Sequence, residues 1–245
     1  MINHNYFYLF ISFLLGSAIA SFLYAWAMRI CQTGETILDP SKCRFCEKKL
    51  SPLELIPILS WLIQRGRCYC QKHRLSSGYF ISEIVLGSAF VTIGYNYPMQ
   101  EALFLSFFAS ALLFFFLTDA MHQVLYLPMM ALNGIVGFFY LSYYQDQSID
   151  ISLGGIFLGF AVLYSINFIY LKIKQRQGFG SGDKFLLASI GAWLGPMKVI
   201  KLLFLASWLG VIYALFLMYK GRANLLTKLP LGLFLSLATP IIYLT

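Results

Sequence analysis

Two aspartates stand out in this 245-residue sequence because each adjoins a strongly apolar segment. Asp119 ends an apolar run that begins at Phe104, and Asp183 opens another run directly after the glycine-rich turn Gly178-Phe-Gly-Ser-Gly182. Carboxylates at membrane depth are energetically unfavourable, so each one needs a structural or functional explanation. Two close carboxylates are suited to hydrolysis, because one of them, ionised, activates water while the other, protonated, polarises the scissile carbonyl.

Each of these acidic residues also has a simpler interpretation. Asp183 precedes a predicted helix, where a carboxylate caps free N–H groups and is stabilised by the helix dipole. Asp119, at the end of a predicted helix, would then only sit among lipid headgroups. Glu83, one turn into another apolar segment, is either a satisfied polar group or a substrate contact. His122, close to Asp119, is interpreted as a surface histidine at the membrane interface.

Cysteines form a second candidate site. Two pairs lie within one polar segment and comprise Cys43, Cys46, Cys68 and Cys70. Four thiolates in two pairs indicate a structural zinc site. His73 could replace one of them, because the second pair is one residue shorter than the usual Cys-x-x-Cys. The alternative is that these thiols are reduced and bind no metal, and Cys31, which is isolated, is interpreted as a packed free thiol.

The elements that must position these residues are membrane helices. Hydrophobic residues make up 59% of the chain and charged residues only 11%, whereas soluble domains carry about 25% charged residues. The apolar residues form runs of about the 20 residues that cross a bilayer as helix. We therefore predict an all-α polytopic membrane protein with eight spans, at 6–27, 79–97, 101–118, 124–144, 151–171, 183–197, 199–219 and 227–244.

The basic residues set the predicted orientation. Most of them follow the first, fifth and seventh spans, and the net charge of +8 is interpreted as membrane topology and not as a nucleic-acid surface. The turn after the fourth span holds Asp146 and Asp150 and no Lys or Arg; only Lys198 and Lys201 fall on the opposite side. The positive-inside rule then places the basic loops in the cytoplasm and both termini on the opposite side of the membrane.

Three regions follow from this topology. Residues 1–27 form the first transmembrane helix, 28–78 a small cysteine-rich cytoplasmic lobe that resembles a zinc ribbon, and 79–245 the transmembrane core. In this arrangement Asp119 and Asp183 both lie at the cytoplasmic ends of their spans, at one depth, so the two carboxylates are predicted to face the cytoplasm together.

Several segments resemble the bacterial prepilin peptidases, also called type IV leader peptidases. Gly180-Ser-Gly-Asp183 resembles the GxGD motif of these enzymes, and Thr118-Asp119 resembles their first aspartate region. The stretch 42–70 resembles their cysteine lobe, Glu83 matches a family glutamate, and 229–235 resembles their last helix. The similarity covers nearly the whole chain and keeps the motifs in order.

The resemblance implies an intramembrane aspartyl protease whose catalytic pair is Asp119 and Asp183. It also implies that the leaders of type IV prepilins and type II secretion pseudopilins are removed at the cytoplasmic face, and that the new N-terminus is methylated with S-adenosylmethionine. Tyr24 stands where the family has Asn, and the Pro-Asp that usually follows the first aspartate is missing. These departures bear on methyl transfer and on the shape of the site.

Two other functions compete with this hypothesis. A transporter would need carboxylates near the bilayer midplane and repeated halves, but both aspartates are predicted at one edge and no repeat is evident. A non-catalytic assembly factor for a pilus or a secretion machine would not need both Asp119 and Asp183. An enzyme is therefore the favoured prediction.

Overall fold

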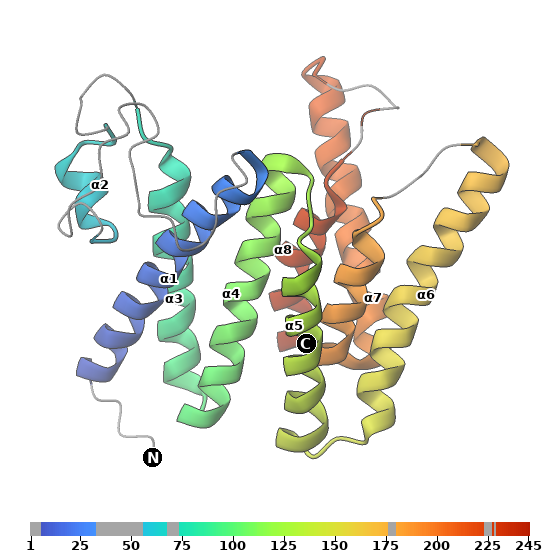
Figure 1. The fold of residues 1–245 in the computed structure, drawn as a ribbon, viewed down its shortest axis with the longest axis horizontal. Helices are drawn as coiled ribbons and strands as arrows, with labels where there is room; N and C mark the ends of the chain where they lie inside the picture. The colour runs from blue at the N-terminus through green and yellow to red at the C-terminus, as the bar shows by residue number, and fades with distance from the viewer. Residues whose placement is uncertain (1–5, 33–55, 68–73, 176–179, 223–226, 228) are drawn as a thin grey trace. The chain divides into compact units, whose positions relative to one another are not determined.

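The computed structural model describes residues 6–32, 56–67, 74–175, 180–222, 227 and 229–245 (Figure 1). Every regular element in these residues is a helix, which confirms the predicted all-α class for this part of the chain. Five helices are long and apolar enough to cross a membrane: α1 (Tyr6–Gln32), α3 (Ser77–Asn96), α4 (Met99–His122), α6 (Ile149–Lys174) and α7 (Asp183–Tyr219). The shorter elements are α2 (Leu59–Ile63), α5 (Leu127–Phe139), the π-helix η2 (Tyr140–Tyr144) and α8 (Leu231–Leu244).

Helix α7 reverses direction within its length. Gly195 has non-helical backbone angles, φ 72° and ψ 171°, and Pro196 follows it. A Cβ atom added at Gly191 would lie 3.1 Å from Cγ2 of Val199, although eight residues of straight helix advance by about 12 Å. The element is therefore a hairpin of two helical arms, as the ribbon shows (Figure 1). The residue with φ 72° is a glycine, the type that adopts this conformation at no steric cost.

The predicted spans correspond to these helices with two differences. The sixth and seventh predicted spans are the two arms of α7, and the fourth is α5 continued by η2. Only five elements satisfy the length and hydropathy of a membrane span in the described residues, so the count of eight stays a prediction. Helix α1 also continues to Gln32, beyond the predicted boundary at residue 27, because residues 28–32 contain no Gly or Pro to end it.

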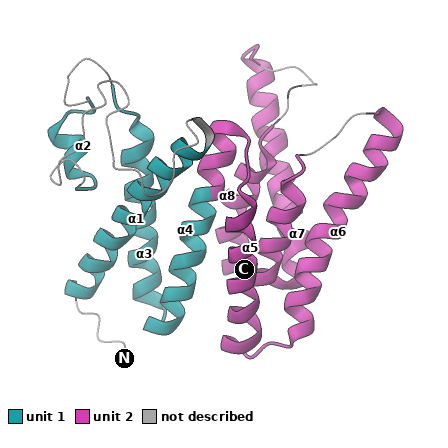
Figure 2. Cartoon of the chain, viewed as in Figure 1, with its two compact units in different colours: residues 1–114 teal, residues 115–245 magenta. Residues whose placement is uncertain are grey.

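The chain divides into two compact units, residues 1–114 (unit 1) and residues 115–245 (unit 2), with the boundary inside α4 (Figure 2). In unit 1, α1 lies against α3 at glycines that leave no room for a side chain. A Cβ atom at Gly16 would lie 2.8 Å from the backbone oxygen of Leu86, and Ser17 Oγ donates to the backbone oxygen of Glu83 at 3.0 Å. Small residues at such positions allow two membrane helices to approach closely.

The N-terminus of α3 makes contacts with both α1 and the segment around α2. Ser76 caps this helix by accepting the Gly78 N–H at 3.1 Å, and the Tyr24 hydroxyl lies 2.8 Å from Ser76 Oγ. In the first turn of α3, the Phe80 ring stacks on the Trp61 ring of α2, with centroids 4.8 Å apart. The short segment around α2 is therefore anchored on α3 by an aromatic stack.

In unit 2, the first arm of α7, residues 183–194, forms the core. Helix α6 packs on this arm through Gly155 and Gly159, and a Cβ atom at Gly159 would lie 2.7 Å from the backbone oxygen of Leu187. Helix α5 packs on the same arm, where Trp193 Nε1 donates to the backbone oxygen of Asn133 at 2.9 Å. The arm that begins with Asp183 is thus held by helices on more than one side.

Candidate active site

Asp119 lies in the last turn of α4, in the part of that helix that belongs to unit 2, and only 4% of it is exposed. Its Oδ2 atom accepts the backbone N–H of Leu233 at 2.7 Å, and the Gly232 N–H is a second donor to the same carboxylate. Both donors belong to the first turn of α8, which follows Pro230 and has no side-chain cap of its own. The first N–H groups of a helix lack partners within it, so Asp119 caps α8 from another helix.

Gly232 makes this contact possible. A Cβ atom added there would lie 2.9 Å from Asp119 Oδ2, 3.1 Å from Asp119 Cγ and 3.1 Å from Leu186 Cδ2. Contacts this short force neighbouring atoms to move, and Leu186 is fully buried. The start of α8 can approach Asp119 only because position 232 carries no side chain.

Asp183 is the first residue of α7 and is 6% exposed. Its Oδ2 atom accepts the backbone N–H of Gly180 at 2.9 Å, so the glycine turn folds back onto its own aspartate. Gly182 is also closely packed, because a Cβ atom there would lie 3.0 Å from Cβ of Leu125 in the connection between α4 and α5. The turn thereby joins the start of α7 to the chain that leaves α4.

The structure brings the Asp119 and Asp183 carboxylates together. They are close enough to interact electrostatically although α5, η2 and α6 separate them in the sequence. Leu186, one turn after Asp183, packs beside Gly232 next to Asp119, so the end of α4 and the starts of α7 and α8 meet at one end of unit 2. Two nearly buried carboxylates, each hydrogen-bonded to backbone N–H groups, form an arrangement that can hold and activate one water molecule.

The predicted zinc ligands lie outside the described residues. Cys43, Cys46, Cys68 and Cys70 are not described, nor is His73. Arg67 and Arg74, which flank the second cysteine pair in the sequence, form an antiparallel β-bridge. Within the described ranges no group of three or more His, Cys, Asp or Glu side chains is placed to hold a metal, and the zinc site stays a prediction.

Glu83 is held inside unit 1 and is 3% exposed. Its Oε2 atom accepts the Ile58 N–H at 2.6 Å, and the Ser21 side chain also hydrogen-bonds to it. Ile58 has φ 64° and ψ −55°, and Leu59 N–H donates to Pro57 O at 2.6 Å, which defines a strained γ-turn. These contacts favour the interpretation of Glu83 as a satisfied polar group that clamps this turn.

Sequence reasoning missed two features of the site. Gly232 and Leu233 were recognised only as part of the last helix, and the signal that could have identified them is a helix start after Pro230 with no side chain able to cap it. His122 was predicted at the surface; the residue is half-buried, and its Nε2 atom is buried with no hydrogen-bond partner among the described residues.

Two family models match the chain. Residues 14–97 match the bacterial peptidase A24 N-terminal domain, and residues 106–215 match the type IV leader peptidase family. The second match contains both Asp119 and Asp183, and the first contains Glu83 and the cysteine segment.

Curated relatives are similar over most of the chain. A prepilin leader peptidase/N-methyltransferase of Pseudomonas aeruginosa is 30% identical, with 84% of this chain and 71% of the relative covered. One of the same name from Bacillus subtilis is 29% identical, with 96% and 93% covered. A type 4 prepilin-like proteins leader peptide-processing enzyme of Escherichia coli is 29% identical, with 82% and 73% covered. No solved structure matches the chain significantly.

Proposed function

Because this chain belongs to the type IV leader peptidase family and is a protease of the kind that processes type IV prepilins, we propose that Asp119 and Asp183 are its catalytic pair. The observation that carries the proposal is the meeting of two nearly buried carboxylates from separate helices, each oriented by backbone N–H groups. The position of Asp119 at the end of α4 does not by itself explain its contacts, because it accepts an N–H from Leu233, 114 residues further along the chain.

The surroundings of the two carboxylates favour different roles. Asp119 faces the N-terminus of α8 and accepts N–H groups from Gly232 and Leu233, and both the N–H groups and the helix dipole stabilise negative charge. Asp183 accepts the single N–H of Gly180. Asp119 is therefore the ionised base, and Asp183 is the protonated acid.

The reaction then follows the chemistry of a shared-proton carboxylate pair. Asp119 takes a proton from water as the water oxygen attacks the scissile carbonyl carbon, and Asp183 gives its proton to the carbonyl oxygen. Collapse of the tetrahedral intermediate restores the carbonyl, and the proton on Asp119 passes to the departing amide nitrogen. Both carboxylates return to their starting protonation once Asp183 regains the hydroxyl proton.

The bonds cleaved are those between the leader and the mature part of type IV prepilins and type II secretion pseudopilins, at the cytoplasmic face of a bacterial inner membrane. The basic residues support this orientation, because Lys172 and Lys174 end α6 on the side of the chain that leads to Asp183. Both termini are accordingly periplasmic.

The N-terminal region supports two further parts of the proposal. Residues 14–97 match the N-terminal domain found in bacterial peptidases of this kind, and relatives carry N-methyltransferase in their names. We therefore assign methylation of the new N-terminus to this chain, with S-adenosylmethionine as methyl donor. We also propose that the cysteine lobe holds a structural zinc ion through Cys43, Cys46, Cys68 and Cys70, because four thiolates in two pairs are a typical zinc ligand set.

The test is cleavage of a full-length prepilin by the purified protein in detergent. Asp119→Asn and Asp183→Asn should each lower the cleavage rate on the order of 10³-fold or more, while unfolding on heating stays close to that of the wild type, because Asn retains an oxygen for the backbone N–H. Full activity in either variant would refute the catalytic pair. A folded wild-type protein that cleaves no prepilin would refute the substrate assignment.

A further inference from the structure

Lys198 is one of the two lysines on the side of the predicted membrane opposite the basic loops. It lies at the start of the second arm of α7, shortly after Pro196. Its side chain is half-buried, and its Nζ atom donates to the backbone oxygen of Tyr243 at 3.0 Å. Lys201, the other lysine of this side, is exposed. A lysine at a membrane interface normally extends its ammonium group towards water, so the inward contact of Lys198 needs its own explanation.

The acceptor of Lys198 lies in the last turn of α8. The last carbonyl groups of a helix have no N–H partner within it, and a cation beside them also interacts favourably with the helix dipole. Nζ of Lys198 lies in addition 5.7 Å from the centroid of the Tyr243 ring, within the range of a cation–π contact. Lys198 therefore binds the C-terminus of α8 through both the backbone and the ring of one residue.

Tyr243 is held from a second element as well. Its hydroxyl lies 2.7 Å from the hydroxyl of Tyr140, the first residue of η2, and Gln145 Nε2 donates to the Tyr140 hydroxyl at 2.9 Å. Tyr140 is almost fully buried, with its ring centroid 5.1 Å from that of Trp193 in the first arm of α7. The element that provides this contact, η2, is a π-helix, a rare conformation that is frequent at functional sites. The end of α8 is thus anchored on η2 and on the second arm of α7.

Helix α8 needs such anchors because its own structure is weak at both ends. It has only 14 residues, and Pro240 inside it removes one of its backbone hydrogen bonds. At its N-terminus no side chain of α8 acts as a cap, and Asp119 supplies the acceptor from another helix. The position of α8 along its axis therefore depends on other elements, with Asp119 at one end and Lys198 at the other.

The two ends of α8 are linked by the helix itself. From Gly232 to Tyr243, eleven residues of helix give a length of about 16 Å. We propose that Lys198 is a positioning residue for the catalytic pair, which fixes the axial position of α8 and thereby the N–H groups that α8 donates to Asp119. This inference rests on the proposed function. Without the anchor, α8 slides or its last turn unwinds, and the Leu233 N–H leaves the position from which it holds Asp119.

A kinetic comparison of the two lysines provides the first test. Lys198→Met keeps an unbranched side chain but removes the ammonium group, and it should lower kcat for full-length prepilin about tenfold with KM nearly unchanged, because a displaced α8 misplaces Asp119. Lys198→Arg retains a charged donor and should keep most of kcat. Lys201→Met is the matched control and should behave as the wild type. Wild-type kcat in a folded Lys198→Met protein, or equal losses at the two lysines, would overturn the proposal.

A double substitution separates positioning from a general loss of stability. Gly232→Ala crowds the contact between α8 and Asp119 directly, because the added Cβ atom would lie 2.9 Å from Asp119 Oδ2. Substitutions at distant sites multiply their effects unless both act on the same contact. Lys198→Met should therefore lower kcat by no more than about twofold when Gly232→Ala is already present. The full tenfold loss in both backgrounds would show that Lys198 acts by another route and would overturn the proposal.

The position of α8 can also be measured without any cleavage. Spin labels replace Leu237 on α8 and Phe157 on α6, which are 50% and 74% exposed. The distance between the labels, measured by pulsed electron paramagnetic resonance, should shift or broaden in Lys198→Met and stay unchanged in Lys201→Met. A lower kcat with an unchanged distance would overturn the proposal. A wild-type protein that cleaves no prepilin would instead refute the proposed function, and the distances would still show whether Lys198 anchors α8.

Tyr140→Phe is a milder variant for use if Lys198→Met does not fold. It removes one hydroxyl from the same end of α8 and keeps the buried ring, so kcat should fall about threefold, as expected from the loss of one hydrogen bond. This loss should again nearly disappear in the Gly232→Ala background. An unchanged kcat in Tyr140→Phe, together with an unfolded Lys198→Met protein, would make Lys198 a residue required only for folding and would overturn the proposal.

Discussion

Unit 1 and unit 2 each contain a nearly buried carboxylate that accepts a backbone N–H from a distant segment. In unit 1, Glu83 accepts from Ile58 at 2.6 Å, and in unit 2, Asp119 accepts from Leu233 at 2.7 Å. Their exposed fractions are 3% and 4%. By burial and by hydrogen bond the two residues are almost the same, yet Glu83 clamps a turn, whereas Asp119 faces a second carboxylate.

The difference shows which observation points to catalysis. A buried carboxylate with a backbone donor is satisfied and can be purely structural. Among the described residues, only unit 2 has a second carboxylate, Asp183, that interacts with the first, and a pair of this kind is what acid–base hydrolysis requires. A second carboxylate nearby is therefore better evidence for a catalytic role than burial of the first carboxylate is.

Amide substitution tests the comparison most strongly. Asp119→Asn should reduce prepilin cleavage on the order of 10³-fold, because the amide cannot accept the proton from water. Glu83→Gln should leave cleavage within about threefold of the wild type, because its amide oxygen still accepts the Ile58 N–H and no proton transfer depends on it. Initial rates with a labelled prepilin measure both. A loss at Glu83→Gln as large as at Asp119→Asn would place Glu83 in the catalytic machinery.

Crowding the Asp119 contact should have the next largest effect. Gly232→Ala places a Cβ atom 2.9 Å from Asp119 Oδ2, and displacing a catalytic group by about 1 Å costs about 10²-fold in rate. The loss should appear mainly in kcat, because Gly232 contacts the proposed catalytic residue Asp119.

Gly210→Ala is the matched control for this substitution. A Cβ atom at Gly210 would lie 3.5 Å from Cδ2 of Phe234, an ordinary contact, so its kinetics should stay at the wild-type level. If Gly232→Ala retains full kcat in a folded protein, the start of α8 does not position Asp119.

Removing the clamp in unit 1 should change stability more than activity. Glu83→Ala leaves the Ile58 N–H without its acceptor and should lower the free energy of unfolding by about 1–3 kcal/mol. The measurement is denaturant or thermal unfolding in detergent, followed by near-UV circular dichroism. An unchanged stability would show that the strained γ-turn at Ile58 does not depend on Glu83.

The smallest effect on cleavage is expected from a substitution in the cysteine lobe. Cys46→Ser should remove most of the zinc measured by elemental analysis, since three remaining ligands hold the ion poorly, while the Asp119–Asp183 pair in unit 2 keeps most of its activity. Wild-type protein that retains less than about half an equivalent of zinc after dialysis would contradict a structural zinc site.

Much of the fold could be predicted because a bilayer imposes a simple requirement on the sequence. Runs of about 20 apolar residues located α1, α3, α4 and α6, and Gly195 with Pro196 located the break in α7. The ends were less predictable: α1 continues past its apolar run to Gln32, because hydropathy marks the lipid-facing length of a helix and not the point where it stops.

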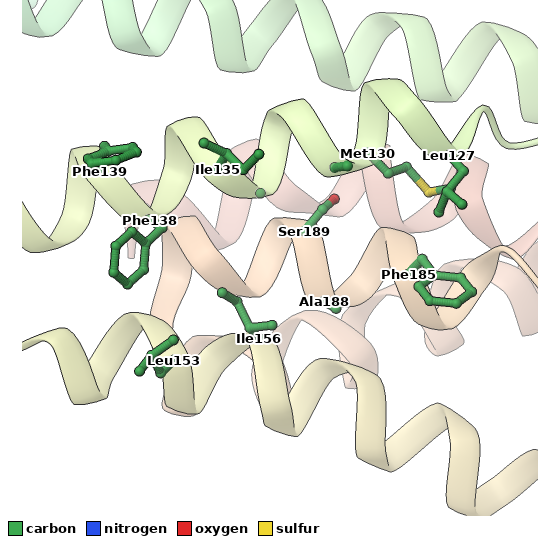
Figure 3. Close-up of a pocket in the computed structure, with 12 residues that line it drawn as sticks. Leu127, Met130, Ile135, Phe138, Phe139, Leu153, Ile156, Phe185, Ala188 and Ser189 are labelled. Carbon is green, nitrogen blue, oxygen red and sulfur yellow. The ribbon is translucent and has the colours of Figure 1, made fainter.

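The site was predictable only in its side chains. Asp119 and Asp183 could be identified because carboxylates are rare next to apolar runs. The N–H groups of Gly232 and Leu233 could not be identified, since every residue except proline carries a backbone N–H group. Residue type therefore does not show which of these groups binds a carboxylate. An apolar groove between α5 and α6, lined in part by Gly134 and Ala188 (Figure 3), depends on where these helices diverge, which residue types permit but do not specify.

The capping of α8 by Asp119 has a consequence for biosynthesis. The donor at Leu233 is added to the growing chain 114 residues after its acceptor, and contacts of such long range form late because closing the intervening loop is entropically costly. A nascent chain that has inserted α4 and even the Asp183 turn still holds Asp119 without its helix. The proposed catalytic pair is therefore held in place only after α8 has been added to the chain, so a chain that lacks α8 should not cleave prepilin.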